Sequence, residues 1–173
     1  MEQVSFRRFA ALVAITVGVS LATAPAQADS KRKRSGTNTI VSTLQKNTSA
    51  ITDVPGHEIS QQIAFQRTTK SSDPALLDMQ ITDFGQVDEV AGTGTHRGYS
   101  MAVLKDGSSS PTRYEGTHKK TVKADGSWDS VFEGKYWLLP GTGKMKNVKG
   151  EGTYKCKYLP DVSSCDWEEE SEY

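Results

Sequence analysis

The side chains that could carry acid–base chemistry near neutral pH are three histidines, His57, His96 and His118. None of them stands at a spacing from other ligand residues that is typical of a zinc site, so the sequence predicts no bound metal. His118 falls in the middle of a predicted strand. It is the histidine whose partner across a folded sheet can be inferred from the turn that follows it.

The partner of His118 depends on the turn at Asp125-Gly126. Asp-Gly is a strong hairpin signal because the tight turns that match strand twist need positive φ, which glycine adopts without steric cost. A two-residue loop places His118 opposite Glu133, whereas a three-residue loop shifts the register and breaks this pair. A His–Glu pair inside a barrel could transfer a proton, and the same pair outside would be an ordinary ion pair. His118 and Glu133 are therefore the candidate catalytic residues.

A repeated triplet supplies a second set of candidates. Tyr114-Glu115-Gly116 and Phe132-Glu133-Gly134 both carry an aromatic residue, a glutamate and a glycine in that order. Packing alone explains glycines beside large aromatics in a tapered barrel. A carboxylate that faced the lumen would be costly to bury unless it bound a partner, so Glu115 or Glu133 is also a candidate ligand contact.

Aromatic residues alternate along the segment that contains the second triplet. Trp128, Phe132 and Tyr136 share one parity, and alternation of this kind places them on one face of a strand. That face points into apolar surroundings. The three side chains either form the core of a small domain or line a ligand site together with Glu115.

Nucleotide-binding motifs fail at specific positions. Gly141-Thr142-Gly143-Lys144 resembles part of a phosphate loop, but Leu138 stands where the first glycine is needed and Met145 where a hydroxyl is needed. The 21 basic and 21 acidic side chains balance, which excludes a general polyanion binder. We therefore expect no nucleic-acid partner and no cofactor.

These side chains must be positioned by β-strands, because the chain from His57 onward alternates in short stretches separated by turn residues and shows no amphipathic helix. Eight strands in sequence joined as hairpins predict an all-β fold, an antiparallel meander that closes into an eight-stranded barrel. The expected strands are about Glu58–Thr68, Leu77–Val90, Gly98–Leu104, Thr112–Lys123, Ser127–Leu138, Lys144–Gly150, Gly152–Tyr158 and Cys165–Glu170.

The segment Phe132–Tyr154 resembles a signature of allene oxide cyclase-like barrels, the calycin-type group that includes dirigent proteins and uncharacterised bacterial members. It carries a strand, then Gly141-Thr142-Gly143, a short apolar-centred strand, and Gly150-Glu151-Gly152 opening the next strand. The resemblance implies an eight-stranded barrel with ligands held in the lumen. It transfers no particular reaction, because members of the group differ in activity.

The first 28 residues are predicted to be a secretory signal peptide. Arg7 and Arg8 precede an apolar run and Ala26-Gln27-Ala28, which favours cleavage after Ala28. The apolar run is shorter than the roughly 20 residues that a bilayer requires, so no membrane span is expected after cleavage. Residues 29–56 begin with Lys31-Arg32-Lys33-Arg34 and are otherwise polar, which predicts a flexible basic arm before a barrel domain over residues 57–173.

Export changes the interpretation of the two cysteines, Cys156 and Cys165. In an oxidising compartment, a pair of thiols predicts a disulfide rather than a metal pair. The intervening segment contains turn residues, so the bridge would join the two strands of the last hairpin. The alternative is two free buried cysteines.

Together these features predict a periplasmic or secreted β-barrel that binds a small apolar or aromatic molecule in its lumen. Two alternatives remain open. A cyclase or isomerase would act on a lumen-bound substrate with His118 or Glu133 as the acid–base group. A structural or surface-interaction protein would have a lumen filled by its own side chains.

Overall fold

The computed structural model describes residues 31–159 and 162–172. The predicted signal peptide, with its cleavage after Ala28, lies outside the described residues. Within the described ranges, no helix combines the length and the apolar character needed to cross a membrane.

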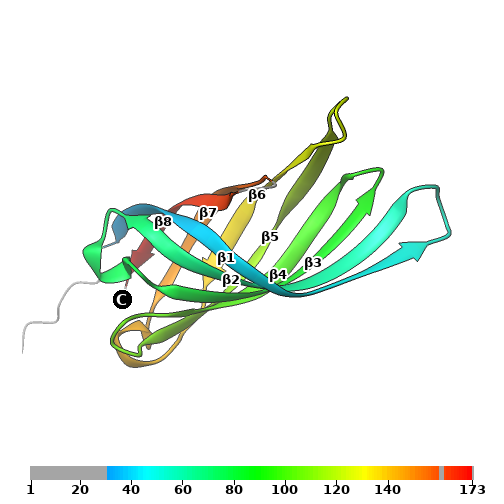
Figure 1. The fold of residues 1–173 in the computed structure, drawn as a ribbon. Helices are drawn as coiled ribbons and strands as arrows, with labels where there is room; N and C mark the ends of the chain where they lie inside the picture. The colour runs from blue at the N-terminus through cyan, green and yellow to red at the C-terminus, as the bar shows by residue number, and fades with distance from the viewer. Residues whose placement is uncertain (1–30, 160–161, 173) are drawn as a thin grey trace, which may run out of the picture.

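Eight antiparallel strands follow one another around a closed barrel, and the last strand pairs with the first (Figure 1). The predicted eight-stranded all-β fold is confirmed. Closure gives every strand two neighbouring strands, although residues 40–51 of the first strand pair with the second strand alone. The elements are β1 (Arg32–Ile51), β2 (His57–Ser71), η1 (Pro74–Leu76), β3 (Gln80–Val90), β4 (Thr93–Val103), β5 (Ser109–Val122), β6 (Trp128–Leu138), η2 (Gly143–Met145), β7 (Lys149–Tyr158) and β8 (Ser163–Glu172), where η denotes a turn of 3-10 helix.

The eight strands are not the eight that the sequence predicted. The segments Lys144–Gly150 and Gly152–Tyr158 were expected as two strands. Lys144 and Met145 instead lie in η2, residues 146–148 form a turn, and Lys149–Tyr158 form one strand, β7. Gly152 lies within β7 and does not interrupt it. A glycine is needed at this position because a side chain would overlap the ring of Tyr136 on β6. The eighth strand comes from the other end of the chain.

The prediction of a flexible arm over residues 29–56 is wrong for its described part. Residues Arg32–Ile51 form β1, which pairs with β2 on one side and with β8 on the other. The side chain of Arg34 is buried, with Nε at 2.8 Å from Asp73 and Nη1 at 3.4 Å from Glu169. Up to Thr39, β1 is held by main-chain hydrogen bonds on both sides and by ion pairs, so this part of the strand needs few apolar residues.

The turn between β5 and β6 decides which residues face each other across the sheet. The amide of Lys123 donates to the carbonyl of Ser127 at 2.8 Å, and Gly126 has a φ of 81°, which together describe a three-residue loop. His118 therefore lies opposite Phe132, and Glu133 lies opposite Thr117. The two-residue loop, and with it the His118–Glu133 pair, is wrong.

Glycines on the inner face make room for aromatic rings from the neighbouring strands. A Cβ at Gly152 would lie 2.5 Å from Cζ of Tyr136, and a Cβ at Gly36 would lie 2.5 Å from Cζ2 of Trp167. A Cβ at Gly134 would likewise meet the phenol oxygen of Tyr154 at 2.8 Å. Each ring therefore packs against the backbone of a glycine on a neighbouring strand, and a side chain at that glycine would displace the ring.

One end of the barrel is closed by a small hydrophobic core. Leu76 from η1, Leu104 from the turn after β4, and Met145 from η2 pack with Val148 and Trp167. In Figure 1, the β1–β2 and β5–β6 hairpins project from the opposite end of the barrel. The core therefore forms the floor of the lumen.

The predicted disulfide between Cys156 and Cys165 is present, with an S–S distance of 2.09 Å. The two residues are direct partners on β7 and β8, and both side chains are buried. The bridge thus joins the two strands of the last hairpin, as the sequence predicted.

The packing of rings on glycine predicts the outcome of two alanine substitutions. Gly152→Ala should lower the free energy of unfolding by about 3 kcal/mol, because the new methyl group would overlap both the backbone carbonyl oxygen of Glu168 and the ring of Tyr136. Gly126→Ala is the matched control, since a Cβ there meets nothing within 4 Å and only the positive φ opposes it, at about 1 kcal/mol. Urea denaturation measures both values, and equal losses would contradict the packing argument.

Candidate functional site

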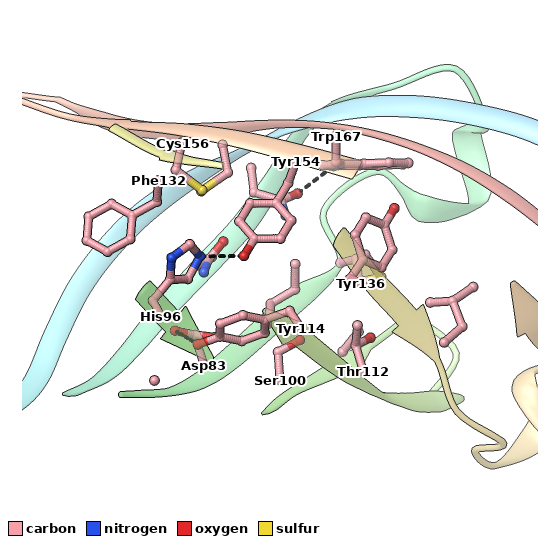
Figure 2. A pocket seen from close by; sticks show the side chains of 18 of the residues that line it. Asp83, His96, Ser100, Thr112, Tyr114, Phe132, Tyr136, Tyr154, Cys156 and Trp167 are labelled. Atoms are coloured by element: carbon pink, nitrogen blue, oxygen red, sulfur yellow. Dashed lines mark hydrogen bonds between the residues drawn. A yellow bond between two sulfur atoms is a disulfide. The ribbon is translucent and has the colours of Figure 1, made fainter. Parts of the chain in front are cut away.

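The lumen above the hydrophobic floor is not filled by side chains. It holds a cavity of about 150 Å³, which Figure 2 shows from close by. A protein cavity of about this volume can hold one benzene molecule. The site therefore suits a ligand of about one ring.

The walls of the cavity are mainly aromatic. Tyr114, Phe132, Tyr136, Tyr154 and Trp167 all border it, from strands β5 to β8. Tyr154 contacts Tyr114 edge to face, with ring centroids 6.0 Å apart, and contacts Tyr136 at a tilt, with ring centroids 6.4 Å apart. Rings braced in this way present fixed apolar and π surfaces to the lumen.

Asp83 on β3 brings one carboxyl group to this cavity. The residue is only 6% exposed, and the phenol of Tyr114 donates a hydrogen bond of 3.2 Å to Oδ2. Burial disfavours the charged form and raises the pKa of the Asp83 carboxyl to about 7, although the hydrogen bond from Tyr114 acts in the opposite direction. A carboxyl group of this kind can exchange a proton near neutral pH.

His96 on β4 also borders the cavity. Its Nε2 atom and the phenol oxygen of Tyr154 share a hydrogen bond, drawn as a dashed line in Figure 2. Burial, together with a smaller contribution from the nearby His118, lowers the pKa of His96 to about 4. The imidazole is therefore neutral at pH 7 and adds no positive charge to the lumen.

His118, a candidate catalytic residue, lies inside the barrel within a chain of polar groups. Its Nδ1 atom is 2.8 Å from the carboxylate of Glu89, and its Nε2 atom is 3.1 Å from the hydroxyl of Ser130. Glu89 reaches His118 across Gly94, the residue paired with both of them. Burial lowers the pKa of His118, partly offset by the charge of Glu89.

Ser130, His118 and Glu89 are the same three kinds of group, a hydroxyl, an imidazole and a carboxylate, that form the catalytic triad of serine hydrolases. The side chains of Ser130 and His118 are nevertheless buried, and the ring of Phe132 stacks on the imidazole at 4.2 Å between centroids. Neither residue borders the cavity described above. In this conformation Glu89 and Ser130 can hold His118 in place, but these buried groups are closed to a substrate in the lumen.

The two glutamates of the repeated triplets lie on the outside of the barrel. Glu133 forms an ion pair of 2.9 Å with Lys155 of β7, and Glu115 is exposed opposite Lys135 of β6. Both border a wide hollow on the exterior, of about 1050 Å³, rather than the cavity in the lumen. The prediction that Glu115 or Glu133 contacts a ligand in the lumen is therefore wrong, because both side chains point outward.

The aromatic candidates divide between the lumen and its far end. Phe132 and Tyr136 border the cavity, on the inner face predicted from their parity. Trp128 has the same parity but lies at the first residue of β6, away from the cavity, with the ammonium of Lys120 at 5.6 Å from its ring centroid. The structure thus brings Phe132 and Tyr136 together and separates both from Trp128.

Sequence reasoning missed Asp83, His96, Tyr114 and Tyr154 as cavity residues. The signal for Asp83 was present, because it shares one parity of β3 with Ile81, Gly85, Val87 and Glu89, so that two acids interrupt an otherwise apolar inward-facing series. Recognising it required knowing which face of the strand is inside. That face follows only from the pairing register of neighbouring strands.

Candidate metal ligands are also absent from the described parts of the chain, where no three His, Cys, Asp or Glu side chains are arranged to hold an ion. The chain matches no model of a known protein family and no curated protein. The resemblance to allene oxide cyclase-like barrels stays a prediction from the segment Phe132–Tyr154. Function is therefore inferred from the geometry of the lumen.

The buried carboxyl of Asp83 predicts how stability depends on pH. Its pKa is about 7 in the folded protein and 3.8 in the unfolded chain, so its contribution is complete below pH 3.8 and is lost as the pH rises through 7. Above that range the buried charge should cost about 4 kcal/mol. Asp83→Asn should therefore gain stability relative to the unmodified protein between pH 4 and pH 8.

Urea denaturation of both proteins at pH 4, 6 and 8 measures this difference. Glu151→Gln is the control, because the carboxyl of Glu151 is exposed on β7 and should not produce the same trend. If the free energies of unfolding of Asp83→Asn and the unmodified protein differed by the same amount at every pH, burial would not have raised the pKa of Asp83, and the prediction would be wrong.

Proposed function

We propose that this chain is an exported β-barrel protein that holds a small apolar or aromatic molecule in its lumen without covalent chemistry. The observation that carries the proposal is the cavity of about 150 Å³ bordered by aromatic rings. A lumen filled by its own side chains, as a purely structural barrel would have, is not what the described residues form. The floor of packed Leu76, Met145 and Val148 gives the cavity one closed end.

The size of the cavity limits the ligand and its affinity. A guest of about one ring has roughly eight non-hydrogen atoms, and the best ligands of that size gain about 1.5 kcal/mol per atom at most. Ordinary guests gain a fraction of this, so dissociation constants between about 1 µM and 1 mM are expected. The braced rings reduce the cost of ordering the site when the ligand enters.

Export is the second part of the proposal. It rests on the amino-terminal pattern ending at Ala28, and the disulfide between Cys156 and Cys165 is compatible with an oxidising compartment. We also propose membership of the allene oxide cyclase-like barrels, which the Gly-Thr-Gly segment after β6 and the eight-stranded barrel both support.

An isomerase or cyclase is a second candidate. The observation that favours it is the chain Glu89–His118–Ser130, which would hold His118 as an oriented base. Substrate would reach His118 only if Phe132 moved from its stacked position. Binding without chemistry requires no such movement, and for that reason we prefer it.

Filling the lumen should abolish binding of a neutral aromatic probe. Ser100 borders the cavity on β4, and Ser100→Leu places additional carbon atoms inside it. Phenol at ten times its Kd should stabilise the unmodified protein by about 1.4 kcal/mol, measured as a rise in Tm, and should leave Ser100→Leu unchanged. Thr117→Leu, on the outer face of β5, is the matched control and should respond to phenol like the unmodified protein.

Circular dichroism would establish that both variants keep the barrel. A response to phenol that survives in Ser100→Leu and disappears in Thr117→Leu would place the site on the exterior and overturn the proposed function.

A further inference from the structure

The carboxyl group of Asp83 is accessible from the cavity because its cross-strand neighbours are small. Asp83 pairs with Ala64 on β2 and with Ser100 on β4, and neither side chain extends over it. On one side Tyr114 donates to Oδ2. Figure 2 shows the carboxyl beside the ring of Tyr114 at the border of the lumen.

No basic side chain of the described residues forms an ion pair with Asp83, and the one hydrogen bond given to its carboxyl comes from a neutral phenol. The other carboxylate that borders the cavity differs in this respect. Arg34 lies 3.4 Å from Glu169, and the hydroxyls of Ser171 and Tyr136 donate to it. Asp83 is therefore the acid at the border of the cavity whose negative charge no basic side chain of the described residues balances.

The walls around Asp83 add a second attraction for positive charge. Tyr114, Tyr154 and Tyr158 border the same cavity, together with Phe132, Tyr136 and Trp167. The face of an aromatic ring carries partial negative charge and attracts cations, and cages of such rings are a common way to bind ammonium groups. The neutral imidazole of His96 does not oppose this attraction.

We propose that the lumen binds a small organic cation, an amine whose ammonium group pairs with Asp83 and whose apolar part packs against the aromatic rings. This inference rests on the proposed function and names the chemical class of its ligand. A cationic guest supplies the charge that Asp83 lacks. A ligand carboxylate would meet a second negative group in the same enclosed space and is excluded.

A pair of probes with one shape and different charge tests the proposal. Benzylamine is cationic at pH 8, and benzyl alcohol has the same number of non-hydrogen atoms but no charge. The unmodified protein should bind benzylamine about tenfold more tightly than benzyl alcohol in isothermal titration calorimetry, the ratio expected for one charged hydrogen bond. Benzoate, of similar size and opposite charge, should show no binding.

Two variants connect the preference to Asp83. Asp83→Asn should remove the preference, by weakening benzylamine about tenfold while changing benzyl alcohol less than about threefold. Glu115→Gln is the matched control, because it removes a carboxylate from the outer face of β5 and should leave both affinities unchanged. The comparison of the three probes on the unmodified protein stands even where a variant fails to fold.

Each result separates this inference from the function on which it rests. Benzyl alcohol binding as tightly as benzylamine, or a preference that persists in Asp83→Asn, would overturn the cation proposal and leave a neutral-ligand lumen. Benzoate binding more tightly than benzylamine would overturn it as well. Failure of all three probes to bind the unmodified protein would overturn lumen binding itself.

Discussion

The structure depends on the pairing of its first strand with its last. β1 and β8 align in register from Arg32 with Ser171 to Thr39 with Ser164, and this ladder turns a meander into a closed barrel. Arg34 lies in this seam, buried between Asp73 and Glu169. A buried ion pair is costly to leave half-formed, so these residues favour this closure over other pairings. The basic start of β1 and the acidic strand β8 are two sides of one seam, across which Lys31 pairs with Glu170 and Arg34 with Glu169.

Closure creates a lumen, and the distribution of glycines determines how much of it is filled. Glycines such as Gly98 and Gly152 let Tyr114 and Tyr136 lie flat across neighbouring backbones instead of standing into the interior. Aromatic rings therefore form walls, and space for about one further ring remains between them. Within these walls a single acid, Asp83, is unbalanced. The same packing that stabilises the barrel thus defines both the size of the site and its polarity.

The sequence was sufficient for features that depend on local pattern. Alternation and turn residues predicted the barrel, parity predicted that Phe132 and Tyr136 share an inner face, and the two cysteines predicted the bridge. It was insufficient where long-range pairing decides. β1 contains few apolar residues. Its first part, residues 32–39, is instead stabilised by main-chain pairing on both sides and by the ion pairs of Arg34. One additional residue in the loop at Gly126 changed the partner of His118, and Asp83 became recognisable as a lumen residue only once the register had defined the inside.

The central claim is that the lumen is a binding site in which the carboxylate of Asp83 pairs with the charged group of the ligand. It is tested most directly by a crystal structure of the protein soaked with 4-bromobenzylamine, in which the anomalous signal locates the bromine atom. The account predicts a bromine peak inside the barrel among Phe132, Tyr136 and Tyr154, with the amine nitrogen within hydrogen-bond distance of the Asp83 carboxylate. A peak confined to the exterior hollow beside Glu115 and Glu133, with the lumen unchanged, would contradict it.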